Sequence, residues 1–220
     1  MSQYSVFENA IKLESNGQYT EALRLFEFSL QNSDHDTGDI LFHCGWCLEN
    51  IPPVSIHTVI GFYKEAAHSS SIVLCRMNSF FRIGWLLMQN KEYEEADGYL
   101  RKSIQLHEAE QVHEGIYHQA LYWSAVCREF LGYYIQAIKL YQHIQKISPL
   151  LNPESRYRQI KCLLQVGSFT DVLSICESFN QPPPAGFDPL RYQQLQKLAE
   201  LEYQSMQNCL SDQYITQEEL

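Results

Sequence analysis

The chain has 220 residues, of which 45% are hydrophobic and 19% charged, a composition typical of a globular protein with a sizeable core. Its formal net charge is −10 and its 16 Lys and Arg residues form no basic run, so we expect no nucleic-acid partner and favour a neutral or cationic one. No apolar run reaches the roughly 18 residues of a membrane span and the first residues lack a signal-peptide pattern, so we expect a cytoplasmic protein that binds no membrane.

Apolar residues recur at intervals of three and four along most of the chain, which predicts amphipathic helices and almost no strand. One pattern appears five times, in residues 17–30, 57–70, 91–104, 132–145 and, more weakly, 167–180. Each copy has a small or β-branched residue followed one turn later by a larger one. The first set is Ala22, Val59, Ala96, Ala137 and Val172; the second is Phe26, Tyr63, Leu100, Tyr141 and Cys176. We expect two helices to cross closely at the small residue, with the larger one filling the groove beside it.

A partner helix is predicted about a dozen residues before each of these segments. Two of the partners, FHCGWCLEN at 42–50 and FRIGWLLMQ at 81–89, share Phe, Gly and Trp at corresponding positions. Cys44 and Cys47 of the first correspond to Ile83 and Leu86 of the second. Because one copy uses Cys where the other uses an aliphatic residue, the shared requirement is apolar packing.

Together these helix pairs resemble the tetratricopeptide repeat family, whose second helix carries G-x-Y-x-x-A-x-x-x-F/Y and whose first has a small central residue. The best-fitting copy has Ala125, Gly132, Tyr134, Ala137, Tyr141 and Pro149. The resemblance covers roughly residues 4–180 and implies a right-handed all-α solenoid of about five helix pairs. It also implies a non-catalytic scaffold or adaptor that binds a protein or peptide.

The copies depart from a uniform 34-residue spacing. Pro52 and Pro53 must end the helix before them. Residues 107–119, between the third and fourth pairs, are predicted to be helical, which places His107 and His113 on a long solvated helix.

After residue 180 the repeat pattern stops. We therefore divide the chain into a repeat domain at 1–180, a linker and capping helix at 181–210, and a flexible acidic tail at 211–220. The cap is needed because the last repeat would otherwise expose its apolar face. The residues predicted to point inward from the cap are Leu195, Leu198, Ala199 and Met206.

The C-x-x-C spacing of Cys44 and Cys47 keeps a metal or redox enzyme open as an alternative. Structural zinc needs four ligands, so His43 and His57 would have to complete such a site. A thioredoxin-like motif needs a strand that leads into a helix, whereas these surroundings are helical. We favour packed thiols, with no metal and no cofactor.

Other catalytic patterns are weak. The sequence has no G-x-S-x-G, phosphate-loop or H-E-x-x-H motif. Two E-x-x-H spacings, at 65–68 and 110–113, lack the closed bundle that a di-iron site requires. We therefore expect no catalytic residue.

By the resemblance, a partner lies against the first helix of each pair, in a concave groove. Aromatic rings with an amide one turn beyond would bury apolar side chains and hydrogen-bond an extended backbone. The predicted groove residues are Phe42, Trp46, Asn50, Phe81, Arg82, Trp85, Gln89, Tyr122, Glu129, Tyr157 and Lys161. A clamp for a peptide carboxylate is not expected, because only Arg82 occupies a matching position. A regulator that senses a short signalling peptide, and a homodimer, remain open.

Overall fold

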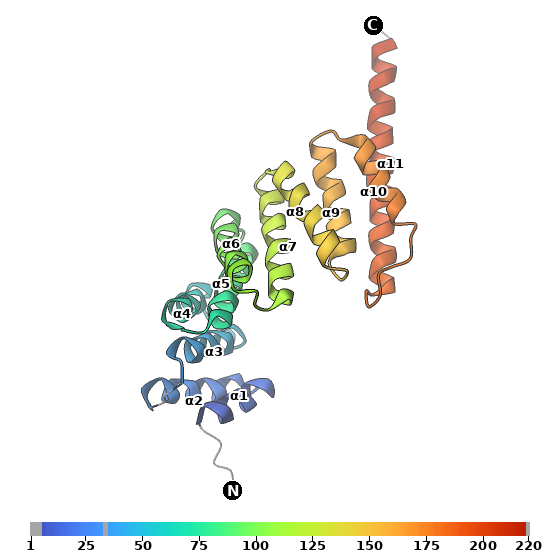
Figure 1. The fold of residues 1–220 in the computed structure, drawn as a ribbon. Coiled ribbons are helices and arrows are strands. Elements are labelled where there is room, and N and C mark those ends of the chain that lie inside the picture. Colours follow the sequence, from blue (N-terminus) through green and yellow to red (C-terminus); the bar gives the residue numbers. More distant parts are fainter. Residues whose placement is uncertain (1–5, 33–34, 219–220) are drawn as a thin grey trace. The chain divides into compact units, whose positions relative to one another are not determined.

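The computed structural model describes residues 6–32 and 35–218, which form eleven α-helices and contain no strand (Figure 1). This agrees with the all-α prediction. The contacts of the chain group residues 1–120 into one compact unit and residues 121–220 into another. The predicted division at residue 180 concerns where the repeats end, and it stays a prediction.

Unit 1 is a series of antiparallel hairpins in which each helix packs on the next. Helix α3 also contacts α5, so the first helices of the second and third pairs are neighbours. The six helices of this unit are α1 (Val6–Ser15), α2 (Tyr19–Asn32), α3 (Thr37–Glu49), α4 (Ile56–Ser69), α5 (Val73–Gln89) and α6 (Tyr93–Glu110). Helix α3 ends before Pro52 and Pro53, as predicted.

Unit 2 centres on α9, which packs against α8, α10 and α11. Helix α7 begins in unit 1 and continues into unit 2. The helices are α7 (Glu114–Phe130), α8 (Tyr134–Ile147), α9 (Asn152–Gln165), α10 (Phe169–Ser178) and α11 (Pro189–Glu218).

The predicted cap is α11. Leu195, Ala199 and Met206 are buried as expected, but Leu198 is 37% exposed, so it does not point inward. The helix also continues to Glu218, past the predicted end at residue 210. No Gly or Pro follows Pro189 in the sequence, so nothing in the backbone chemistry interrupts the helix.

The small and large positions of the repeat form the core as predicted. All five small residues are buried, and so are Phe26, Tyr63, Leu100 and Tyr141. Cys176, in the weakest copy, is only partly buried. The periodicity of the sequence therefore identified the buried face of each second helix.

Glycine marks the close helix crossings of unit 1. A Cβ atom on Gly84 would lie 2.6 Å from Cγ of Leu100, and one on Gly45 would lie 3.0 Å from Cε1 of Tyr63. Real Cβ atoms almost never approach another atom within 3.0 Å. The small residue of the first helix thus faces the large residue of the second.

The segment between α6 and α7 is not the continuous helix that we predicted. Helix α6 ends at Glu110 and α7 begins at Glu114. Between them Gln111 and His113 have φ values of 54° and 41°, in the left-handed region that a right-handed helix cannot contain.

This break buries His107, which we predicted to be solvated. Its ring stacks on Tyr117 at a centroid distance of 4.1 Å, and its Nδ1 forms a hydrogen bond with the carbonyl of Val112. The chain reversal after α6 brings these partners back against the last turn of the helix. His113 itself is exposed.

Candidate functional site

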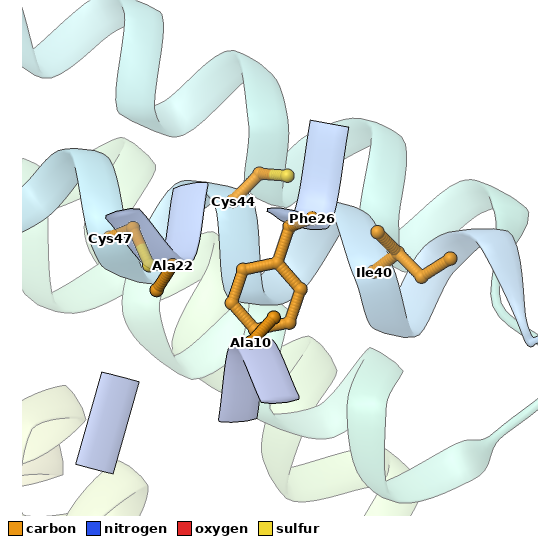
Figure 2. Close-up of a cluster of buried hydrophobic side chains, with 6 residues drawn as sticks. All are labelled: Ala10, Ala22, Phe26, Ile40, Cys44 and Cys47. Atoms are coloured by element: carbon orange, nitrogen blue, oxygen red, sulfur yellow. The ribbon is translucent and has the colours of Figure 1, made fainter. Parts of the chain in front are cut away.

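The two cysteines of the C-x-x-C motif lie in the core of unit 1, each with 0% of its surface exposed. Burial raises the pKa of both thiols to about 12. Metal ligation and nucleophilic attack both use the thiolate, so the protonated form that burial favours is a poor participant in either. Figure 2 shows these side chains in a cluster of Ala10, Ala22, Phe26, Ile40, Cys44 and Cys47. The predicted packing of the thiols is confirmed.

Of the two histidines proposed as further ligands, His43 lies near Cys47, because both contact the Glu14 carboxylate, which is 4.0 Å from Sγ of Cys47. Nδ1 of His43 is 2.7 Å from Oε2 of Glu14, and its ring stacks on Phe26 at 5.1 Å between centroids. His57 is exposed near the start of α4. Among the described residues, no three His, Cys, Asp or Glu side chains are placed to hold one metal ion.

The predicted contact residues of unit 1 lie in two stripes, one on α3 and one on α5. Within each stripe the residues are one helical turn apart, and the two helices are in contact. The four aromatic rings are half-buried and the two amides are exposed. We call these residues the α3/α5 face: Phe42, Trp46 and Asn50 on α3, with Phe81, Trp85 and Gln89 on α5.

Individual contacts fix part of this face. The ring of Phe42 lies 5.4 Å from that of Tyr63, so one of its sides is used in the core. Nδ2 of Asn50 donates to the carbonyl oxygen of Trp46 at 2.8 Å. In the part of the chain that the structure describes, no donor pairs with the amide oxygen of Asn50, so it can accept a hydrogen bond from a partner.

Arg82 holds α3 and α5 together beneath the face. Its guanidinium forms an ion pair with Glu49, and its central carbon lies 4.8 Å from the centre of the Trp46 ring. The hydroxyl of Tyr63 donates to the same Glu49 carboxylate at 2.8 Å. Burial raises the pKa of Tyr63, so this hydroxyl stays a donor. Arg82 therefore positions Trp46, and it is not a free ligand for a partner carboxylate.

The same arrangement recurs in unit 2. Arg158 on α9 pairs with Glu129 on α7 at 2.8 Å, and the Tyr141 hydroxyl donates to this carboxylate at 2.8 Å. At the start of the chain Glu14 and His43 occupy the corresponding positions.

The third repeat breaks this series. Its corresponding residues are Met88, Leu100 and Trp123, and none of them is charged. The division between the two units falls in this part of the sequence.

The predicted contact residues of unit 2 are largely buried or paired with other residues of the same unit. Tyr122 is 7% exposed and packs against Trp123 and Tyr141, so its ring belongs to the core and not to a binding surface. The Glu129 carboxylate is also 3.7 Å from Nζ of Lys161.

Tyr157 contacts the capping helix. Its hydroxyl lies 3.5 Å from Oε1 of Glu202 on α11. The sequence could not show this contact, because the two residues are 45 positions apart.

A pocket that the sequence did not predict lies between α4, α5 and α6. Its volume is about 630 Å³. Each helix contributes residues about one turn apart, which is the only trace of the pocket in the sequence. The lining residues are Lys64, Ala67, His68, Ser70, Arg76, Phe80, Tyr99 and Lys102.

Comparison with known families identifies one of the helix pairs. Residues 78–109, which span most of α5 and α6, match the tetratricopeptide repeat model. The chain contains a tetratricopeptide repeat. The matched segment includes Gly84 and Leu100, which face each other where α5 crosses α6.

Solved tetratricopeptide-repeat structures share the fold at low sequence identity. YrrB, described as a TPR protein with an unusual peptide-binding site, is 14% identical with a TM-score of 0.66, over 88% of each chain. MamA is 16% identical with a TM-score of 0.60, over 80% of this chain and 95% of its own. TPR-like repeats of a putative kinesin light chain from Podosopora anserina are 12% identical with a TM-score of 0.57, over 92% and 95%. These similarities confirm the all-α helical repeat fold.

No curated protein matches the sequence. In the described part of the chain, no helix is both long and apolar enough to cross a membrane.

Proposed function

We propose that this chain is a non-catalytic protein-interaction scaffold, and that its α3/α5 face binds an extended segment of a partner protein. One observation supports this most directly. Four half-buried aromatic rings and two exposed amides share a face whose Trp46 is held in place by Arg82. A ring that is already ordered loses little conformational entropy on binding, so more of the contact energy contributes to affinity.

Each kind of side chain on this face has a separate role. The exposed parts of the Trp46 and Trp85 side chains would bury apolar side chains of the partner, as aromatic anchors do at interfaces. The amides of Asn50 and Gln89 would hydrogen-bond the partner's backbone, because each amide offers both a donor and an acceptor and the backbone needs both. An extended segment fits because a helix pairs most of its backbone groups internally, whereas an isolated extended segment leaves them unpaired.

The expected partner is neutral or cationic. The chain has ten more acidic than basic residues, so an acidic segment would meet long-range repulsion. Arg82 already pairs with Glu49, so it does not offer an anchor for a terminal carboxylate. A cytoplasmic location and a homodimer remain predictions.

A peptide ligand also agrees with one of the proteins of the same fold, since YrrB is described as having a peptide-binding site. At 14% identity this is an argument about what the fold can support, and the choice of face comes from the side chains of this chain.

The test compares three purified forms in affinity capture from a cell lysate: wild type, Trp46→Ala/Trp85→Ala, and Phe28→Ala/Tyr133→Ala. The last pair removes two rings that are each 53% exposed and lie off the α3/α5 face. We expect a bound protein that is lost only from the tryptophan variant. Far-UV circular dichroism must show equal helicity in all three forms.

Peptides from the captured partner then show whether the face recognises a linear segment or a folded domain. If a linear peptide of about ten residues competes with the whole partner, the face recognises a segment, as a scaffold or peptide-sensing regulator requires. Equal capture by wild type and the tryptophan variant would contradict the proposal. So would a partner that competes only as a folded domain.

A further inference from the structure

The pocket between α4, α5 and α6 gathers positive charge on a strongly acidic chain. Lys64 and His68 come from α4, Arg76 from α5 and Lys102 from α6. Three of the chain's 16 Lys and Arg residues therefore line one pocket of about 630 Å³. That volume is within the usual range for ligand pockets.

Two aromatic rings hold the lysines in place. Nζ of Lys102 lies 4.5 Å from the centre of the Tyr99 ring, and Nζ of Lys64 lies 5.5 Å from the same centre. Lys102 also lies 5.5 Å from the ring of Phe80. Cations over ring faces are attracted by the ring quadrupole, which leaves the N–H donors free for another group.

Little of this charge is neutralised. Glu95 lies 3.8 Å from Nζ of Lys64, and both side chains are about half exposed. In the described part of the chain, no carboxylate forms an ion pair with Arg76 or Lys102. The Asp36 carboxylate accepts hydrogen bonds from Ser71, next to the lining residue Ser70, so three cations and two carboxylates leave a net positive charge around the pocket before any contribution from His68.

We propose that this pocket binds a phosphorylated side chain of a partner peptide. A phosphate monoester carries about −1.5 to −2 charges at neutral pH and three acceptor oxygens, which matches the charge and the donors present. A single carboxylate carries less negative charge and fewer acceptor oxygens than a phosphate monoester. The pocket is larger than a phosphate group, so the apolar surfaces of Ala67, Phe80 and Tyr99 would contact neighbouring atoms of the peptide.

This site is separate from the α3/α5 face, although both use α5. Phe80 and Phe81 are adjacent in sequence, and successive helical residues point about 100° apart. Arg76 and Trp85 are nine residues apart, which places them about 180° apart around the helix axis. The pocket does not depend on the function proposed for the other face.

Short synthetic peptides test the proposal. One pentapeptide is made with phosphotyrosine, with phosphoserine, with glutamate and with unmodified tyrosine at its central position. Binding to the full chain is measured by isothermal titration calorimetry at low and at physiological salt. We expect at least one phosphopeptide to bind at least tenfold more tightly than the glutamate and unmodified peptides, with affinity falling as salt is raised.

Paired variants locate the site. Lys64→Gln/Lys102→Gln should weaken phosphopeptide binding by about tenfold for each lysine removed, because one charge-assisted hydrogen bond corresponds to about that factor. Lys139→Gln/Lys197→Gln makes the same change of charge at exposed positions in unit 2 and should leave the dissociation constant unchanged. Trp46→Ala/Trp85→Ala should also retain phosphopeptide binding.

Several results would overturn the proposal. One is an equal loss of affinity in Lys64→Gln/Lys102→Gln and in Lys139→Gln/Lys197→Gln. Another is a glutamate peptide that binds as tightly as the phosphopeptides. A third is inorganic phosphate that binds as tightly as the phosphopeptides. Binding to vesicles of anionic lipid without binding to the phosphopeptides would also overturn it. Circular dichroism and thermal unfolding of each variant show whether a loss of binding reflects a loss of fold.

Discussion

Arg82 on α5 forms an ion pair with Glu49 on α3, across 33 positions of sequence, while its guanidinium lies against the ring of Trp46. The side chains of the pair are only 18% and 17% exposed. Arg158 and Glu129 form the same kind of pair in unit 2. A partly buried charge pair thus joins α3 to α5 in unit 1 and α7 to α9 in unit 2.

Breaking this pair should destabilise the fold. In Glu49→Ala, Arg82 and the Tyr63 hydroxyl lose their shared acceptor, and we expect the free energy of unfolding to fall by about 2–3 kcal/mol. Glu49→Ala/Arg82→Met removes both charges and should recover part of that loss. Urea unfolding measures both variants. A loss below about 0.5 kcal/mol in the single variant would show that the pair contributes little.

Two glycines offer a matched pair of alanine substitutions. In Gly84→Ala the new Cβ would lie 2.6 Å from Cγ of Leu100, so we expect a loss of about 1–3 kcal/mol from overpacking. At Gly98, in α6, a new Cβ would meet no atom within 4 Å, and Gly98→Ala should stabilise the helix by up to about 1 kcal/mol. The midpoint temperature of thermal unfolding should fall for Gly84→Ala and rise for Gly98→Ala. If both variants shifted the midpoint in the same direction, the close crossing of α5 and α6 at Gly84 would be contradicted.

Thiol reactivity should follow burial. With iodoacetamide at pH 8, the exposed Cys209 should react first, and the partly buried Cys176 more slowly. Cys44 and Cys47 should react only after unfolding, because burial raises their pKa to about 12 and little thiolate forms. Mass spectrometry of labelled peptides checks this order. Rapid native labelling of Cys44, or stoichiometric zinc held there, would contradict the packed interpretation.

Asp36 should make stability depend on acid pH. Burial opposes the charged form, but hydrogen bonds from Ser71 and from the backbone of Asp39 lower the pKa of Asp36 to about 2. Since this value is below the ordinary 3.8, the stabilising contribution is present above about pH 4 and is lost as the pH falls towards 2. For a partly exposed carboxylate we expect about 1 kcal/mol.

The comparison of wild type with Asp36→Asn isolates this effect. The difference between their free energies of unfolding should be largest near pH 6 and should shrink between about pH 4 and pH 2. Urea unfolding at each pH measures it. A difference that stays constant across this range would mean that the charge of Asp36 contributes nothing.

The helices and their buried faces could be predicted because they depend on local spacing. A small residue and a larger one a turn apart recur in every copy, so Ala22 and Phe26 indicate the same crossing as Ala137 and Tyr141. The identity of Cys44 and Cys47 as packing residues followed from their aliphatic counterparts. His107 was predicted wrongly, because periodicity cannot show that the left-handed Gln111 ends the helix.

The sequence by itself determined the repeated helix pairs, the interior position of the cysteines and a set of aromatic residues on the first helices. Only the tertiary structure decided that Arg82 supports Trp46, that Tyr122 is buried, and that Lys64 and Lys102 share one aromatic ring. Spacing along a helix fixes which face a side chain is on. Which residues that side chain contacts depends on how separate helices pack, and the contacting residues are tens of positions apart in the sequence.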